Sequence, residues 1–71
     1  MIREGTTVQW TWGSGKAEGK VQKTYTQSVT KNFDGNEVTR HGEANNKALL
    51  IKQNDGSEVL KLESEVSRLA K

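Results

Sequence analysis

Apolar and polar positions alternate through the first third of the chain, from residue 7 to residue 25. In an extended chain, side chains spaced two apart lie on one face. Val8, Trp10 and Trp12 are spaced two apart in the first stretch, and Ala17, Gly19, Val21 and Tyr25 repeat this pattern after the glycines. The other parity of residues 16–26 is polar or charged, which is typical of a solvated face. The pattern predicts two half-buried strands, at residues 7–12 and 16–25, joined by the polar loop 13–15. We expect Gly19, inside the second strand, to mark a bend.

A second pair of strands is predicted near the end of the chain. Residues 48–51 form the densest apolar run, and its lack of alternation favours a strand that is covered on both sides. Residues 54–57, Asn-Asp-Gly-Ser, form the strongest hairpin signal in the chain. Residues 58–62 then alternate again and are expected to be the returning strand.

The regions around these two pairs carry weaker signals. Residues 27–35 have only Val29 and Phe33 as large apolar groups, and Asp34-Gly35 indicates a turn. Residues 36–40 are predicted to form a short strand, followed by a polar loop. Near the C-terminus, Ser64 can cap one or two helical turns. The predicted fold is all-β: one domain over residues 1–71, a small five-stranded SH3-like barrel with a short C-terminal helical turn.

Composition narrows the chemistry that such a small domain can perform. The 71 residues carry 11 basic and 9 acidic side chains, a net charge of +2, and no cysteine. Disulfides and zinc-thiolate sites are therefore excluded. No apolar run approaches the roughly 20 residues of a membrane-spanning helix, and no signal-peptide core is present, so we expect a cytoplasmic protein without a membrane partner.

Catalysis finds little support in the sequence. His41 is the only histidine, and no orienting partner for it is evident. Neither metal-ligand spacing nor a phosphate-binding glycine loop is present. We therefore expect no enzyme activity, no metal and no cofactor.

Several short motifs, in their order along the chain, resemble the hypervirulence-associated Tudor-domain family. They are Gly5 to Trp10, Gly19 to Val21, Thr39 to Gly42, Ala48 to Ile51, Asp55-Gly56, Val59 to Lys61 and Ser64-Glu65. The resemblance covers nearly the whole chain. It implies a Tudor-type barrel that acts as a binding module.

Two kinds of partner are consistent with such a module. The first is a protein or peptide; a methylated side chain would need an aromatic cage, for which Trp12, Tyr25 and Phe33 are the candidates. The alternative is weak nucleic-acid binding, with Lys20, Lys23 and Arg40 among the basic groups and Trp12 or Tyr25 as stacking platforms. Trp10, in mid-strand, is expected in the core, and Trp12 at the rim. The oligomeric state is left open.

Overall fold

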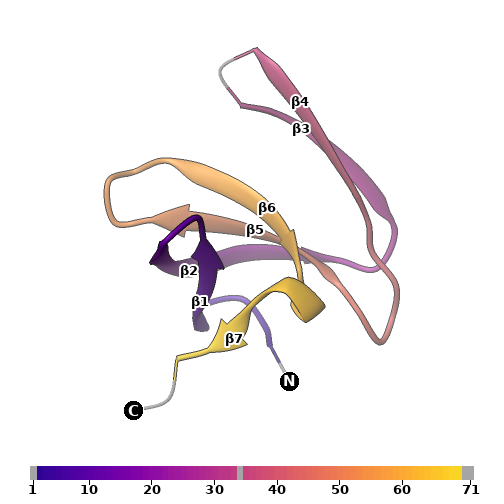
Figure 1. The fold of residues 1–71 in the computed structure, drawn as a ribbon. Coiled ribbons are helices and arrows are strands. Elements are labelled where there is room, and N and C mark those ends of the chain that lie inside the picture. Colours follow the sequence, from indigo (N-terminus) through magenta and orange to yellow (C-terminus); the bar gives the residue numbers. More distant parts are fainter. Residues whose placement is uncertain (1, 34, 70–71) are drawn as a thin grey trace.

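Seven antiparallel strands and one short helical turn make up the described residues, 2–33 and 35–69, of this computed structural model (Figure 1). The elements are β1 (Thr7–Trp12), β2 (Gly15–Tyr25), β3 (Ser28–Phe33), β4 (Asn36–His41), β5 (Ala48–Gln53), β6 (Glu58–Leu62), the 3-10 helix η1 (Glu63–Glu65) and β7 (Ser67–Arg68). Five strands form one sheet in the order β6-β5-β2-β1-β7, and β3 pairs with β4 in a separate hairpin. In Figure 1 this hairpin projects away from the larger sheet.

The all-β class is confirmed, but the strand count and the barrel closure differ from the prediction. The strand predicted at residues 36–40 pairs with β3 rather than joining the large sheet, and the fifth member of that sheet is the two-residue β7. Because β6 and β7 are the two edges of the large sheet, its hydrogen bonding does not close it into a barrel. The one or two helical turns predicted from Ser64 are reduced to the single 3-10 turn η1, which has Ser64 inside it rather than at its cap and is followed by strand β7.

A bulge in β2 corrects the face assigned to Tyr25. Val21 pairs with Ile51 on β5, whereas the next pair is Lys23 with Leu50. Gln22 is therefore an extra residue that has no partner on β5. An extra residue shifts the parity of everything after it. Tyr25 therefore lies on the opposite face of the sheet from Val21. Gly19, where the bend was expected, is instead a point of close approach: a Cβ there would lie 2.6 Å from the carbonyl oxygen of Lys52.

One face of the large sheet carries the main core. This cluster consists of Ile2, Val8, Trp10, Val21, Leu49 and Ile51, with Ala17, Val59 and Val66 packed against it. Trp10 is only 7% exposed, which confirms it as a core residue. The side chain of Trp12 lies outside the described part of the structure, so its predicted rim position stays a prediction.

The other face of β5 and β6 is also covered, as predicted for residues 48–51. Ala48, Leu50 and Leu60 are buried but belong to no part of the main core. Strands β3 and β4 both contact β6, and alternate hairpin residues, among them Val29 and Val38, are half-buried. The hairpin therefore forms a second apolar layer on this face.

The turn between β5 and β6 has the predicted form. Gly56 has a φ of 91°, which favours glycine, and its amide donates to the carbonyl oxygen of Gln53 at 3.0 Å. The Ser57 hydroxyl and amide both donate to Asp55 Oδ1, at 2.6 and 2.9 Å. These bonds, the hydroxyl first, hold the pKa of the Asp55 carboxyl below its ordinary value.

Candidate functional site

A groove of about 300 Å³ separates the hairpin from the edge of the large sheet. One wall is formed by β4 with Phe33 at the end of β3, and the other by β6. Its lining residues are Phe33, Asn36, Val38, Arg40, Glu58, Val59, Leu60 and Lys61. Phe33 and Glu58 also line an adjoining hollow beside Gly56 and Ser57, at the turn between β5 and β6. The groove and this hollow therefore meet at Phe33 and Glu58.

Strand pairing explains why these hairpin residues face the sheet. Lys31 lies opposite Val38, Val29 opposite Arg40, and Phe33 opposite Asn36, so these pairs share one face of the hairpin. The other face carries Ser28, Thr30, Asn32, Glu37, Thr39 and His41, which are all exposed. The half-buried face places the apolar groups of Phe33 and Val38 beside Leu60.

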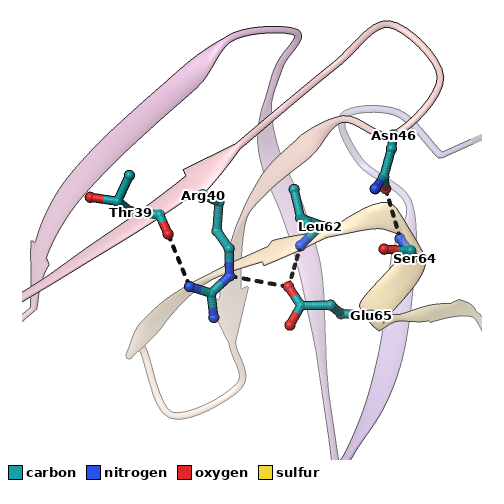
Figure 2. A network of polar contacts seen from close by, with 6 residues as sticks. All are labelled: Thr39, Arg40, Asn46, Leu62, Ser64 and Glu65. Atoms are coloured by element: carbon teal, nitrogen blue, oxygen red, sulfur yellow. Dashed lines mark hydrogen bonds and ion pairs between the residues drawn. The ribbon is translucent and has the colours of Figure 1, made fainter.

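A polar network fixes the hairpin to the 3-10 helix at one end of the groove (Figure 2). Arg40 Nε donates to Glu65 Oε1 at 3.1 Å, and the same oxygen accepts the Leu62 amide at 2.8 Å. Arg40 also donates to the carbonyl oxygen of its neighbour Thr39. The Ser64 amide donates to Asn46 Oδ1 at 3.0 Å, which ties the loop after β4 to the same turn.

The environment of Glu65 favours its charged form. Partial burial acts to raise the pKa of the Glu65 carboxyl. The hydrogen bond from the Leu62 amide, the contact with Arg40 and the nearby charge of Lys61 outweigh that effect and leave the pKa below its ordinary value. The carboxylate and the guanidinium are therefore both charged near neutral pH, as an ion pair requires.

The structure distributes the predicted site residues over three places. Phe33 and Arg40 lie together in the groove, although Arg40 is engaged by Glu65. Lys20 and Lys23 are exposed on β2. Lys20 lies opposite Lys52 on β5, and Lys23, which lies opposite Leu50, is on the same face of the sheet. Tyr25 ends β2 and does not line the groove.

The proposed aromatic cage meets a competing group at Tyr25. The ammonium of Lys31 lies 5.8 Å from the centroid of the Tyr25 ring, within the range of a cation–π contact. An external methylated cation would have to share that ring with Lys31 or displace it. The cage of Trp12, Tyr25 and Phe33 stays a prediction, because the Trp12 side chain lies outside the described residues.

His41 has a partner that the sequence did not indicate. Its Nδ1 lies 2.8 Å from Ser28 Oγ, across the hairpin on the exposed face. A serine nucleophile needs its histidine to be oriented by a third group and needs a pocket for the substrate. Among the described hydrogen bonds none joins the His41 ring to a carboxylate, and His41 is not among the residues that line the groove.

Three further observations concern the described residues outside the groove. A second hollow of about 270 Å³ lies between β1 and η1 and is lined mostly by polar residues, together with Trp10 and Val66. No group of three or more His, Asp or Glu side chains in residues 2–33 and 35–69 could hold a metal ion. No helix of the described chain is long and apolar enough to cross a membrane.

Sequence reasoning missed most of the groove wall. Val38 and Leu60 had been assigned to strands, but nothing in the sequence showed that these strands face each other. The available signal was the weak alternation of Val29, Lys31 and Phe33, which marks one face of a strand.

Comparison with known proteins identifies the family. The searches among curated proteins and among solved structures gave no match to the chain. The profile of the family described as "Hypervirulence associated proteins TUDOR domain" matches residues 5–66, which span β1 to η1 and both walls of the groove. The chain therefore belongs to the family of hypervirulence-associated Tudor domains.

Proposed function

We propose that this protein is a binding module that recognises a protein or peptide through the groove between the β3–β4 hairpin and β6. The observation that carries this proposal is the placement of Phe33 and Val38 opposite Leu60, with polar and charged groups around them. An apolar centre within a polar rim is the usual anatomy of a protein interface. Tudor-type domains generally mediate binding interactions and are typically non-catalytic, which supports the same conclusion.

Selection from a random peptide library on the intact protein tests this proposal. The affinity of each selected peptide is then measured by calorimetry for the wild type and for Phe33→Ala. Because aromatic anchors in interface pockets dominate binding, we expect Phe33→Ala to weaken binding at least tenfold. Thr30→Ala, on the exposed face of the same hairpin, is the matched control and should leave the affinity unchanged.

A second groove variant controls for the case in which Phe33→Ala weakens binding only because it misfolds. Val38→Thr keeps the side-chain shape but adds a hydroxyl to the apolar wall, and its fold is checked by the amide NMR spectrum. Peptides that bind equally well to Phe33→Ala, Val38→Thr and the wild type would place recognition elsewhere and refute the proposal.

Weak nucleic-acid binding is the alternative, and one observation favours it. Lys20, Lys23 and Lys52 gather on one face of β2 and β5 without an ion-pair partner among the described residues. Phosphate contacts make affinity fall steeply as salt rises. Titration of a single-stranded oligonucleotide at about 50 and 200 mM salt, with Lys20→Ala as the test variant, measures this contribution. Salt-insensitive or undetectable binding would exclude it.

A further inference from the structure

The groove is bordered by the edge of β6, not by one of its faces. Four consecutive residues of β6, Glu58 to Lys61, line it. Successive side chains of a strand point to opposite faces, so four in a row can line one groove only along the strand's backbone edge. β6 is an outer strand of the large sheet, and no strand of the described residues pairs with it on this edge.

The register shows which backbone groups point toward the groove. The Glu63 amide donates to the Lys47 carbonyl oxygen at 2.9 Å, and the Gln53 amide donates to the Ser57 carbonyl oxygen at 2.7 Å. Antiparallel ladders alternate hydrogen-bonded and non-hydrogen-bonded pairs. The bonded pairs at residues 57 and 63 therefore make residues 59 and 61 the hydrogen-bonded positions between them. The amides and carbonyls of residues 58, 60 and 62 point away from β5.

These three outward positions differ in their accessibility. The Leu62 amide is already bonded to Glu65. Leu60 is only 2% exposed and lies beneath the hairpin. Glu58 is exposed and lies next to Phe33, at the junction of the groove with the adjoining hollow. The Glu58 amide and carbonyl are therefore the outward backbone pair that a partner can reach.

We propose that the edge of β6 at Glu58 adds an extended peptide strand, which lies in the groove between β6 and the hairpin. This inference rests on the proposed function and specifies its binding mode. A peptide residue opposite Glu58 exchanges two backbone hydrogen bonds with it, as in strand addition to other sheet edges. Alternate side chains of the peptide then face Phe33 and Val38.

The charges along the groove define the chemistry of the peptide. Arg40 and Lys61 lie at one end, and Glu58 lies at the other. A complementary peptide has an acidic residue at the Lys61 end, a basic residue at the Glu58 end, and apolar residues at alternating positions between them. A nucleic-acid backbone would bring its phosphates against Glu58, so the groove favours a peptide.

The test uses peptides selected from a random twelve-residue library on the intact protein. Each backbone amide of a selected peptide is methylated in turn, and the affinity of every derivative is measured. Because Glu58 carries the outward backbone pair that a partner can reach, methylation of the peptide amide opposite Glu58 should weaken binding about tenfold or more, and methylation of the two neighbouring amides should have little effect. Amide exchange at Glu58 should slow when the peptide is bound.

A protein variant tests the same bond from the other side. Glu58→Pro removes the outward amide but no ladder bond to β5, and proline is tolerated at the first residue of a strand. Glu58→Gln keeps the amide and removes only the charge. We expect roughly tenfold weaker peptide binding for Glu58→Pro and at most about threefold for Glu58→Gln. If Glu58→Pro fails to fold, the methylation series on the wild type decides.

The outcomes separate the binding mode from the proposed function. Peptides that depend on Phe33 but lose little affinity on methylation of any single amide would overturn strand addition and leave the proposed function standing. Peptides that depend on neither Phe33 nor Glu58, or no selected peptide at all, would overturn both. Self-association of the protein with slowed Glu58 exchange and no peptide would assign the edge to a second copy of the chain and overturn the peptide as occupant.

Discussion

Gly42 lies at the base of the hairpin, where three backbone segments meet, and we predict that Gly42→Ala is strongly destabilising. Its amide donates to the carbonyl oxygen of Gln27 at 3.2 Å. A Cβ at this position would clash with the carbonyl oxygen of Tyr25 and lie 2.9 Å from the Ala48 nitrogen and 3.0 Å from the Gln27 oxygen. All three are backbone atoms, so no side chain can rotate away.

The size of the effect follows from this geometry. Overpacking in a well-packed site costs about 1–3 kcal/mol, and we expect roughly 3 kcal/mol here because the backbone of three segments must move. A chain of 71 residues has a free energy of unfolding of about 4–11 kcal/mol. The substitution therefore removes a large part of the stability. The melting temperature should fall by about 12–24 °C, at roughly 4–8 °C per kcal/mol.

The matched control is Gly15→Ala, since a Cβ at Gly15 would meet nothing within 4 Å. Neither glycine has a positive φ, so the comparison isolates the clash from backbone strain. Urea unfolding followed by tryptophan fluorescence measures both variants, and Gly15→Ala should stay within about 0.5 kcal/mol of the wild type. A loss below about 1 kcal/mol for Gly42→Ala would refute the close packing at the base of the hairpin.

Three further predictions concern the core, the turn and the ion pair. Trp10→Ala should lower the free energy of unfolding by about 3–5 kcal/mol, measured by circular dichroism, because Trp10 is buried. Trp12→Ala should lower it much less, and equal losses would place both indoles in the core. Gly56→Val should cost about 1–2 kcal/mol in urea unfolding because of its φ of 91°, and a neutral result would contradict that conformation. Glu65→Gln should cost about 1 kcal/mol or less near pH 7, because Glu65 and Arg40 are both partly exposed. Since the pKa of Glu65 is lowered on folding, this difference should be constant above the unfolded pKa of about 4.3 and shrink as the pH falls below it; a difference that grows in acid would contradict the assignment.

The parts of the fold that could be predicted are those in which local signals agree. The alternation around Trp10 and the Asp55-Gly56 turn each determined a pair of strands, because one buried face or one tight turn is enough to specify them. The bulge at Gln22 had no such signal, since an extra residue in a strand needs neither glycine nor proline. The face of Tyr25 was therefore assigned wrongly.

The candidate site was harder to predict because its walls come from distant segments. Phe33 and Arg40 were selected as single residues, for an aromatic ring and a charge, and both lie in the groove. That Leu60 lies beside them is a result of the position of the hairpin relative to β6. That position depends on Gly42 and on the contacts of Glu65, which are tertiary features that no periodicity in the sequence records.

The attachment of the hairpin suggests how the groove responds to a ligand. Two-stranded hairpins have little stability of their own, so β3 and β4 depend on their contacts with β6 and η1. One of these contacts is the partly exposed pair of Arg40 and Glu65, which contributes about 1 kcal/mol at most. A ligand present at 100 times its Kd stabilises the bound state by about 2.7 kcal/mol, which exceeds that contribution. Binding in the groove should therefore slow amide exchange throughout β3 and β4, while exchange in β1 and β2, which do not pair with the hairpin, changes less.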